Sequence, residues 1–558
     1  MKRQIAALIV FSMLLCACAA GGNMIDIDTV DTHALSTGES STGITDTDSQ
    51  QTDSITDAEG TDTIDTDTDT SDNDFDTDSD TTDFDTSDDE RDEDTDDEGT
   101  ISNPNNTGRL EDSAYYDDDE YIRTPKNVLV EMYSTSFWTS SKYDKVVMTP
   151  SQIARYNKNA ASELGSSKIG YWSLNTVEAK VSRAFVKDFI EWDIPNSYAK
   201  YYVGGETHNY SWWSDVISNA NMSGIASSVS VKYGYSVDRA TLRKYPIEEF
   251  ITNDIKNTFD DLGCNGALHP YERLIVIHES ADGKWYYVLM SGASGWVYKD
   301  SVALCKNRTD WINRSTHDDF LVVTGKELRI VYDHMTPEFS NLLLPMGTVL
   351  PLVPADKAPK YVNNRLTYGN YVVKLPTRGS DGYIVDKYAL IPYSSDVSVG
   401  YLPYTRNNVI ALSFKFLGDV YGLKNSMYSV NCSGLVREVY ACFGLYLPTL
   451  ATNQQRASGQ LERIVVEDLN CTEKQELLKT IEPGALLYFS GHIMMYLGEY
   501  EGEYYVISAT GGYHDNDMGE TEVPNLYNVS INTLDVFRSN GLTWLESLWS
   551  IQLVRYAN

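Results

Sequence analysis

The chain has 558 residues, a length typical of several domains, and a formal net charge of −37 at pH 7. Nearly all of this charge comes from one segment rich in Asp, Thr and Ser, residues 19–120. The rest of the chain is close to charge-balanced and has no basic cluster, which argues against nucleic-acid binding.

The first residues combine two basic side chains, Lys2 and Arg3, with an apolar run from 5 to 15 that is too short to span a bilayer. This pattern predicts a signal peptide over residues 1–18. The run ends Leu-Cys-Ala-Cys-Ala, which resembles the bacterial lipoprotein box with Cys18 as the lipidated residue. The alternative is an ordinary signal peptide with incidental cysteines. We therefore expect export and a stable lipid anchor in the cell envelope, at an outer membrane or the cell surface.

The segment 19–120 contains few apolar side chains, and its only Lys or Arg residues are Arg91 and Arg109. Such a segment cannot offset its ordering entropy by burial, and its like charges extend it. It predicts a disordered acidic linker. The Asp-Thr repeats leave Ca²⁺ binding as an alternative, although they lack a spaced loop with the closing Glu of an EF-hand.

Short helical patterns and many aromatic residues follow the linker, over residues 121–228. The clearest helical pattern lies between Ser182 and Trp192. We expect a mainly helical N-terminal segment whose aromatic side chains, including Trp192, form core contacts.

Two regions of short strands separated by turns, residues 229–306 and 318–392, predict two small all-β barrels. The second repeats the first, because Gly382-Tyr383-Ile384 echoes Gly295-Trp296-Val297. Pairs of this kind resemble bacterial SH3-like domains, and two unrelated barrels are the alternative. Cys264 and Cys305 flank the first barrel and are either disulfide-bonded or separate buried thiols.

The last domain, residues 405–558, contains a cysteine where a helix is expected to begin. Asn431 is a good helix N-cap, which places Cys432 in the first turn. The helix carries an apolar stripe at helical spacing, formed by Leu435, Val436, Val439, Tyr440 and Phe443. We expect it to bury one side and to leave its N-terminus for chemistry, where the macrodipole favours a thiolate and the N–H groups can bind an oxyanion. These features alone fit a catalytic and a buried cysteine equally well.

A histidine favours the catalytic interpretation. Strands are predicted over 483–489, 490–498 and 504–508, and Gly491-His492 opens the second of them. This gives a helix followed by an antiparallel sheet, with Cys432 on the helix and His492 on the sheet, so that a general base can reach the thiol as in papain-like enzymes.

Tyr421-Gly422, Cys432-Ser433-Gly434 and Gly491-His492 together resemble the NlpC family of bacterial cell-wall cysteine peptidases. With the helical segment and the two SH3-like domains, the resemblance extends from about residue 121 to the C-terminus and is to the lysin-like branch. It implies hydrolysis of γ-D-glutamyl bonds to a diamino acid in peptidoglycan stem peptides. It also implies that Cys432 is the nucleophile, His492 the base and Tyr421 the cleft tyrosine.

The chain departs from the family pattern at three places. Asn431 replaces the usual Asp before the cysteine, and Leu423-Lys424-Asn425 replaces the usual Trp-Gly-Gly. The residue that orients the histidine is usually His, Asn or Gln, and here the corresponding position is Ser508, a shorter partner. His514 or Asn516 could substitute for it if their loop folds back. We expect Tyr421, Asn431 and Ser433 to contact the substrate.

The sequence thus predicts an α+β protein: a papain-like cysteine peptidase domain, preceded by two SH3-like barrels, a mainly helical segment and a disordered acidic linker. We expect a monomeric peptidoglycan endopeptidase that needs no cofactor or metal. Its partners are peptidoglycan stem peptides and a membrane. A catalytically weakened wall-binding protein and a thiol amidase or acyltransferase on the same fold are the alternatives.

Overall fold

The computed structural model describes residues 122–164, 166–167, 170–171, 173–425, 429–457, 461–515 and 526–556. The predicted signal peptide with Cys18, the acidic linker and Asn516 lie outside the described residues. Within this described part, no helix is long and apolar enough to cross a membrane. All described residues belong to one unit of contiguous contacts.

The N-terminal segment combines helices of 4 to 15 residues with two- and three-residue strands, and that it is mainly helical stays a prediction. Its elements are α1 (Thr135–Trp138), α2 (Pro150–Leu164), α3 (Arg183–Phe189), α4 (Tyr210–Asn219), β1 (Ser166–Ser167), β2 (Gly170–Tyr171), β3 (Lys180–Ser182), β4 (Tyr202–Val203), β5 (Glu206–Thr207) and β6 (Ser228–Ser230). The helix predicted near Ser182 is α3, which begins where the Ser182 hydroxyl accepts from the Phe185 N–H. The prediction that Trp192 forms core contacts is wrong, because 45% of its surface is exposed beyond the end of α3.

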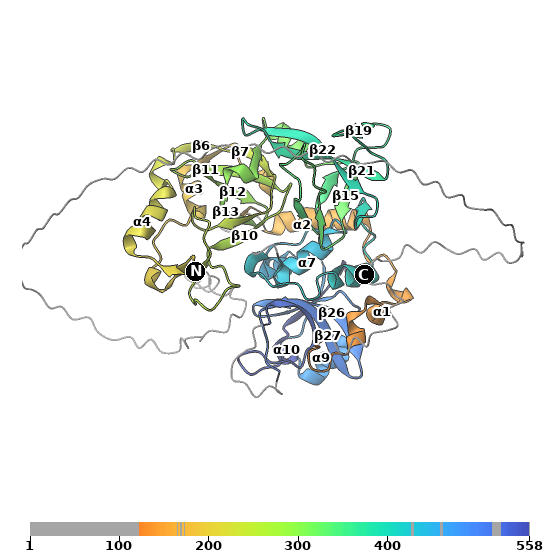
Figure 1. The fold of residues 1–558 in the computed structure, drawn as a ribbon. Helices are drawn as coiled ribbons and strands as arrows, with labels where there is room; N and C mark the ends of the chain where they lie inside the picture. Colours follow the sequence, from red (N-terminus) through yellow and green to blue (C-terminus); the bar gives the residue numbers. More distant parts are fainter. Residues whose placement is uncertain are drawn as a thin grey trace, which may run out of the picture. The chain divides into compact units, whose positions relative to one another are not determined.

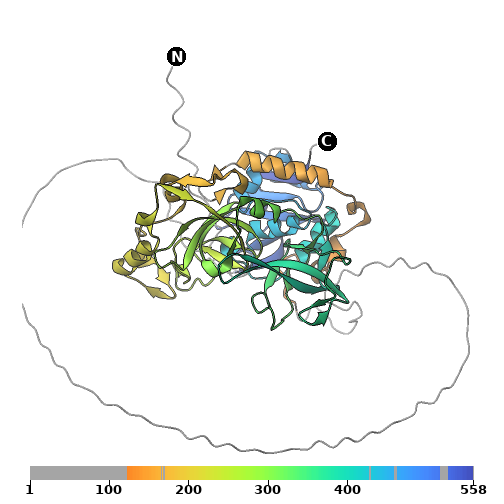
Figure 2. The same ribbon diagram turned by 90° about the horizontal axis from the view of Figure 1, so that it is seen from above.

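The first part of this segment packs on the last domain of the chain (Figures 1 and 2). The Asn157 side chain on α2 donates to the Gly444 carbonyl at 2.8 Å and accepts from the Tyr446 N–H at 3.0 Å. Trp138 and Tyr156 belong to the same hydrophobic core as the last domain. The segment therefore stabilises that domain by apolar burial.

The first barrel has the predicted strands and forms a seven-stranded sheet in the order β10-β8-β13-β12-β11-β7-β14. Its elements are β7 (Lys232–Ser236), β8 (Ala240–Arg243), β9 (Ile251–Thr252), β10 (Cys264–Leu268), β11 (Arg273–Glu279), β12 (Trp285–Met290), β13 (Ala293–Tyr298), β14 (Val302–Leu304) and α5 (Arg308–Asn313), with β9 pairing outside this sheet with β4. Every residue of β12 is buried because its two faces belong to two different cores. Cys264 and Cys305 are separate buried free thiols, so the disulfide alternative does not hold.

Residues 320–399 form several small sheets around a second core that includes Leu321, Leu344 and Val373. The strands are β15 (Phe320–Val323), β16 (Glu327–Arg329), β17 (Leu343–Pro345), β18 (Val349–Pro351), β19 (Tyr361–Val362), β20 (Arg365–Leu366), β21 (Asn370–Arg378), β22 (Ile384–Pro392) and β23 (Val397–Val399). The longest pair is β21 with β22, in antiparallel register from Asn370↔Pro392 to Arg378↔Ile384. That this region is a second SH3-like domain stays a prediction.

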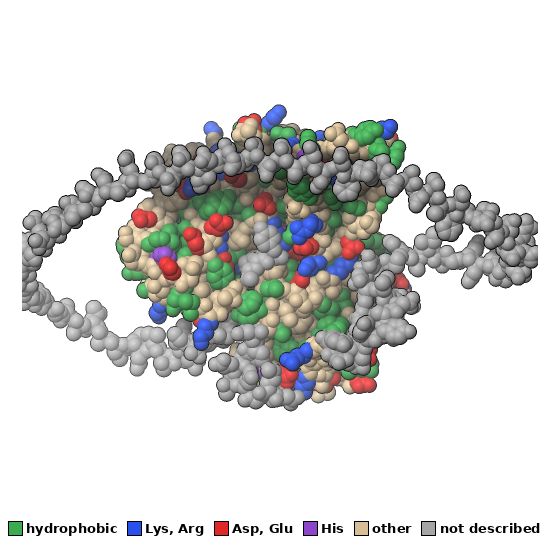
Figure 3. All heavy atoms as spheres, viewed as in Figure 1, with side chains coloured by type: hydrophobic (Ala, Val, Ile, Leu, Met, Phe, Trp, Pro, Cys, Tyr) green, Lys and Arg blue, Asp and Glu red, His purple; other side chains and the backbone are tan. Residues whose placement is uncertain are grey.

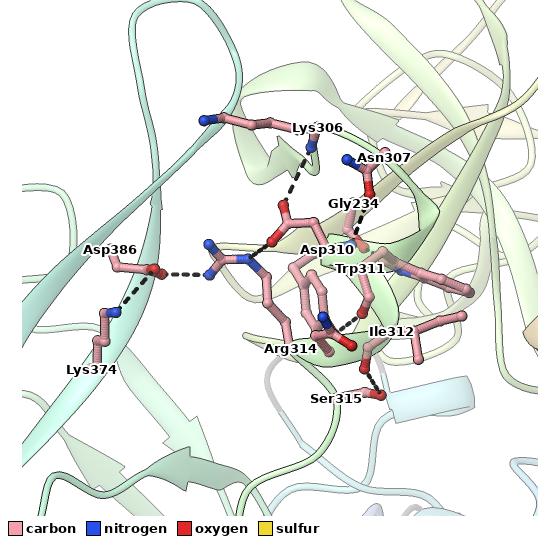
Figure 4. Close-up of polar contacts among 12 residues, drawn as sticks. Gly234, Lys306, Asn307, Asp310, Trp311, Ile312, Arg314, Ser315, Lys374 and Asp386 are labelled. Carbon is pink, nitrogen blue, oxygen red and sulfur yellow. Dashed lines mark hydrogen bonds and ion pairs between the residues drawn. The ribbon is translucent and has the colours of Figure 1, made fainter.

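A charged bridge joins the two barrel regions (Figure 4). Arg314, which follows α5, donates to Asp310 at 2.9 Å and to Asp386 of β22 at 2.6 Å. Lys374 of β21 approaches the second oxygen of Asp386 at 3.6 Å. These partners raise the pKa of Arg314 despite its partial burial, so the guanidinium remains charged.

The last domain is a six-stranded sheet in the order β24-β29-β25-β26-β27-β28, with α7 packed on β26 and β27 (Figure 1). Its elements are α6 (Arg406–Phe414), α7 (Cys432–Ala441), α8 (Ala451–Arg456), α9 (Cys471–Leu478), α10 (Trp544–Ser547), β24 (Leu461–Val465), β25 (Leu486–Phe489), β26 (His492–Tyr500), β27 (Glu503–Thr510), β28 (Asn528–Thr533) and β29 (Ser550–Tyr556). Alternate residues of β26 enter opposite cores, Met495 on the α7 side and Met494 on the other. The predicted helix-then-sheet order is confirmed.

Helix α7 is buried on nearly all sides, and the expectation that it buries only one side is wrong. Its apolar stripe packs on the sheet, as predicted. Glu438 on another side is 3% exposed, with its carboxylate 3.5 Å from His269 of the first barrel. Arg437 forms an ion pair with Glu272 of the same barrel. The apolar pattern of α7 does not predict this burial by the first barrel, because the barrel residues that cover the helix are far away in the sequence.

Acidic and basic side chains are interspersed on the face of the molecule shown in Figure 3. This mixture agrees with the balanced composition outside the acidic segment. The face shown therefore offers no broad positive field of the kind that attracts a phosphate backbone.

Candidate active site

Cys432 is the first residue of α7. The Asn431 side chain accepts from the Gly434 N–H at 2.8 Å and the Asn431 carbonyl accepts from the Leu435 N–H at 2.9 Å. This is the expected N-cap geometry, which satisfies part of the helix start and places Cys432 in the first turn. The Ser433 hydroxyl donates to the Thr449 carbonyl at 2.7 Å, which ties the same turn to the segment before α8. The positive end of the helix dipole therefore lies at the cysteine, where it favours a thiolate.

A turn before α7 supports this helix start. The buried Asn425 side chain accepts from the Asn431 N–H at 3.0 Å. The same amide lies against Gly434, where a Cβ atom would come within 2.0 Å of the Asn425 Oδ1. Glycine at 434 is therefore required by the close approach of Asn425.

His492 is the first residue of β26 and follows a turn in which Gly491 has a φ of +84°. Its Nε2 lies 3.2 Å from the Ser508 hydroxyl on β27. The ring also packs against Phe489 and Trp544, with centroids 5.2 and 5.0 Å away. The structure therefore brings together His492 and the serine that the sequence offered as its partner.

The environment of His492 favours the neutral imidazole. Burial, with a further contribution from the Arg538 guanidinium, lowers the pKa of His492 to about 3. Arg538 is held beside it by stacking over the Phe489 ring at 4.7 Å and by donating to the Ser490 carbonyl at 3.2 Å. The imidazole is therefore in the unprotonated form from which a general base starts, but a pKa so far below neutral makes it a weak base.

Cys432 and His492 line the same cavity, which has about 40 Å³ of space for water-sized molecules. Asn431 and Ser433 also line it, as the substrate-contact prediction requires. The remaining lining side chains come from the turn before α7, from the segment at α8 and from the sheet; they include Lys424, Leu450, Gln455, Tyr488, Phe489 and Trp549. The cavity is therefore narrow and mostly apolar, with a thiol and an imidazole as its reactive groups.

Tyr421 is buried and lies beside Tyr527, with ring centroids 6.0 Å apart, and it is not among the residues that line this cavity. His514 is joined through its backbone to Phe537, while Ser508 is the side chain observed at His492. Asn516 lies outside the described residues.

Sequence reasoning missed Arg538, Trp544 and the cavity role of Lys424. Lys424 itself was a signal, because the family pattern that the sequence resembles has glycine at that position after the tyrosine. Nothing in the local pattern marked Arg538 or Trp544, because they reach His492 only through the fold of the chain after β28. Among the described residues, no cluster of three or more His, Cys, Asp or Glu side chains is arranged to hold a metal ion.

Comparisons with known families agree with this geometry. Residues 418–515 match the model of the NlpC/P60 family, and residues 257–298 match the model of an SH3 domain of the SH3b1 type. No curated protein matches the chain.

Among solved structures, the chain is similar to an NlpC/P60 endopeptidase from Photobacterium damselae subsp. piscicida. The two are 17% identical, the match covers 76% of this chain and 97% of that one, and the TM-score is 0.57, so the likeness is one of fold. An NlpC/P60 family protein from Bacillus cereus ATCC 10987 (17% identity, 52% and 82% coverage, TM-score 0.35) and NlpC2 from Trichomonas vaginalis (16%, 58% and 97%, 0.23) are less alike. The chain therefore carries an SH3b domain and an NlpC/P60 domain, whose family implies a cell-wall peptidase or hydrolase.

Proposed function

We propose that the chain is a peptidoglycan endopeptidase that hydrolyses γ-D-glutamyl–diamino acid bonds in stem peptides, with Cys432 as nucleophile and His492 as base. The observation that carries the proposal is that these two residues, one at a helix start and one on the facing sheet, line a single cavity. The NlpC/P60 match over residues 418–515 supports the cell-wall substrate class.

The proposed reaction begins from a neutral imidazole, in keeping with the low pKa of His492. The imidazole takes the proton from the Cys432 thiol as the sulfur attacks the γ-carbonyl carbon. N–H groups at the start of α7 stabilise the oxyanion. The imidazolium then protonates the leaving amine, the C–N bond breaks and a thioester remains. Water, deprotonated by His492, attacks the thioester and releases the glutamyl γ-carboxylate and the free thiol.

The remaining site residues position these two. Ser508 accepts or donates one hydrogen bond at Nε2 of His492, which leaves Nδ1 as the ring nitrogen for proton transfer. Asn431 and Ser433 hold the helix start and face the substrate from the cavity wall. Tyr421, which packs beside Tyr527 and does not line the cavity, supports the segment before α7 from behind.

Replacing the nucleophile tests the enzyme assignment. Cys432→Ala should abolish the release of peptides from purified stem peptides. Cys471→Ala is the matched control, because Cys471 also begins a helix after an asparagine cap but does not line the cavity. The control should cleave at the wild-type rate. Equal cleavage by Cys432→Ala and the wild type would refute the assignment of Cys432.

A wall-binding protein with little catalytic activity is the second candidate. Two observations favour it: Asn431 stands where the family usually has an acid, and the partner of His492 is a serine at 3.2 Å. A wild-type protein that sediments with peptidoglycan and cleaves none of it would establish this candidate. A thiol amidase or acyltransferase would instead be recognised by its products in mass spectrometry.

We also propose that the protein is a monomer anchored to an envelope membrane through lipidated Cys18, with the acidic segment as a tether. The lipobox-like sequence at residues 15–19 supports the anchor. Cys18→Ser should move the protein from the membrane fraction to the soluble fraction. Unchanged partitioning would contradict the anchor and would leave the assignment of Cys432 unaffected.

A further inference from the structure

Trp192 in the N-terminal segment exposes 45% of its surface, and no other tryptophan among the described residues is as exposed. The Lys187 ammonium lies 5.9 Å from the centre of its ring, near the outer limit of a cation–π contact, and leaves the ring open to solvent. A single exposed apolar side chain is ordinary on a protein surface, whereas several around one hollow mark a binding site. The surroundings of Trp192 are therefore informative.

Trp192 borders a cavity between residues 191–196, which follow α3, and helix α4; we call it the α4 cavity. It has about 680 Å³ of space for water-sized molecules, which is within the size range of small-ligand sites and far larger than the cavity at Cys432. Tyr210, the first residue of α4, lines the same cavity and is 59% exposed. Two exposed aromatic rings from two elements therefore border one hollow in the surface.

Contacts beneath the α4 cavity hold its two walls in place. Before the first wall, the Phe189 carbonyl accepts from the Tyr287 hydroxyl of β12 at 2.6 Å. Ile194 of the first wall and Ile217 of α4 both line the cavity and pack against a buried core that contains Trp213. The cavity is therefore supported by packed side chains, and its exposed rings lie at the edge of a formed core.

Polar side chains make up much of the remaining lining. They are the carboxylates of Glu191 and Asp193, the amide of Asn196 and the hydroxyls of Ser214 and Ser218. No Lys or Arg side chain is among the described residues that line the cavity. Carboxylates, amides and hydroxyls are the groups that pair with the hydroxyl and amide substituents of a neutral ligand, while a ligand phosphate or carboxylate would meet charges of its own sign.

A sugar ring suits both parts of this lining. Its C–H faces stack on aromatic rings, and its hydroxyl and acetamido groups form hydrogen bonds at its edge. A cationic ligand would gain little here, because Glu191 and Asp193 are exposed and ion pairs in water are weak. The α4 cavity therefore fits a neutral carbohydrate better than either class of charged ligand.

We propose that the α4 cavity binds the glycan strand of peptidoglycan, a polymer of N-acetylated hexosamines. The choice of polymer rests on the proposed function, because the stem peptides cleaved in the proposed reaction are attached to this glycan. Trp192 and Tyr210 stack on the sugar rings, and the polar side chains bind the substituents of those rings. The N-terminal segment thus holds the chain on the polymer that carries its substrate.

The first experiment measures binding of a ligand that contains no peptide, so its result does not depend on the proposed function. The full chain is titrated with a β-1,4-linked tetramer of N-acetylglucosamine by isothermal titration calorimetry. The wild type should bind the tetramer. Trp192→Ala should bind it about tenfold more weakly, because the stacking surface is lost, and Trp192→Phe should keep most of the affinity.

An exposed tyrosine outside the cavity provides the matched control. Tyr210→Ala should weaken binding as Trp192→Ala does, whereas Tyr332→Ala, at a residue that is 62% exposed and does not line the cavity, should bind like the wild type. Absence of binding by the wild type, or equal affinity of the wild type and Trp192→Ala, would overturn the proposal.

Salt separates a sugar site from a cation site. Binding of the neutral tetramer should be the same at low and high ionic strength, because it involves no ligand charge to screen. Free stem peptide, whose diamino acid carries an amine, is titrated in parallel. If the tetramer does not bind and the peptide binds in a way that salt and Trp192→Ala both weaken, the α4 cavity is a cation site and the proposal is wrong.

The second experiment connects the α4 cavity with cleavage. The rate on intact peptidoglycan is divided by the rate on isolated stem peptides, which lack the glycan. This ratio should fall about tenfold in Trp192→Ala, in line with the lost affinity, and should keep its wild-type value in Tyr332→Ala. An unchanged ratio in Trp192→Ala would overturn the proposal. A wild-type protein that cleaves neither substrate would refute the proposed function, and the sugar titration would then decide the role of the cavity by itself.

Discussion

One short pattern occurs twice in the last domain: an asparagine cap followed by a cysteine at the first helical position. It is found at Asn431-Cys432 and at Asn470-Cys471. Both cysteines lie at the positive end of a helix, yet only Cys432 shares a cavity with His492. Cys432, the proposed nucleophile, therefore differs from Cys471 in sharing its cavity with a histidine of the sheet.

The hydrogen bond between Ser508 and His492 should matter for turnover. Ser508→Ala removes the hydroxyl that hydrogen-bonds to the imidazole Nε2, so the ring loses a fixed orientation. Loss of one hydrogen bond worth about 1 kcal/mol predicts a fall in kcat of roughly fivefold with little change in KM. Steady-state kinetics across pH measure this effect.

Ser530 provides the control for that variant. It is buried and lies directly opposite Ser508 on the neighbouring strand β28, and its hydroxyl has no hydrogen-bond partner among the described residues. Ser530→Ala should keep the wild-type kcat and pH profile. If both serine variants lose the same activity, the loss reflects a general disturbance of the sheet, and Ser508 does not orient His492.

For single residues, the sequence predicted Cys432, His492 and Ser508, because each stands in a recognisable local motif. It could not predict Arg538 and Trp544, whose positions at His492 depend on the return of the chain after β28. Nor did it predict that Asn425 would support the helix start. That contact requires a left-handed backbone at Asn425, and an asparagine in the sequence does not by itself indicate this conformation.

On the scale of elements, α7 links the catalytic site to the first barrel. Its Glu438 carboxylate faces His269, and both groups are buried. Burial raises the pKa of Glu438 to about 7, although the Arg239 and Arg437 guanidinium groups oppose the shift, and burial lowers the pKa of His269. The pair is therefore neutral in the folded protein below about pH 7.

Glu438→Gln should change the pH dependence of stability. The folded protein binds a proton at Glu438 between the ordinary pKa of 4.5 and about 7, and the unfolded chain does not. The stabilisation is thus present below pH 4.5 and is lost as the pH rises through 7. Glutamine keeps it, so the variant should gain up to about 3 kcal/mol relative to the wild type between pH 4.5 and 7.

Denaturant unfolding at several pH values measures this difference. Glu476→Gln, the same change on the exposed side of α9, serves as the control and should leave the stability close to that of the wild type, because exposed ion pairs contribute little. A difference for Glu438→Gln that stays constant with pH would mean that Glu438 is ionised in the folded protein.

The elements themselves were largely predictable. The strands of the first barrel and the α7–β26–β27 order follow from apolar periodicity and turn residues. The nearly complete burial of α7 was not, because its outer faces are covered by Glu272 and His269 from a barrel more than a hundred residues earlier in the sequence.

Across the whole molecule, the first barrel meets the last domain beside Tyr421. The Phe259 ring stacks on Tyr527 at 4.3 Å, and Tyr527 donates to Asp260 at 3.3 Å. Tyr527 in turn packs beside Tyr421. The barrel therefore contacts the last domain at Tyr527, the neighbour of Tyr421.

Phe259→Ala should loosen this contact. Removal of a partly buried aromatic ring from a stacked pair predicts a loss of about 1–3 kcal/mol and a lower melting temperature. Tyr361→Ala, which removes an exposed ring from β19, is the control and should melt like the wild type. Identical melting of Phe259→Ala and the wild type would show that the stacking contributes nothing to stability.

The order of the domains was visible in the sequence, but their contacts were not. Nothing in the sequence around Phe259 and Tyr527 indicated that their rings would stack. The aromatic residues of the N-terminal segment belong to different cores: Trp138 lies in the core of the last domain, and Trp213 lies in a smaller core. Such partitions depend on how the domains pack together.

The most direct test of the account is mass spectrometry of the products formed when the wild-type protein is incubated with purified stem peptides. We expect two new termini, a free γ-carboxylate on D-glutamate and a free amine on the diamino acid. Neither should form when the Cys432→Ala variant replaces the wild-type protein. Intact peptides with the wild-type protein, or cleavage at any other bond, would contradict the account.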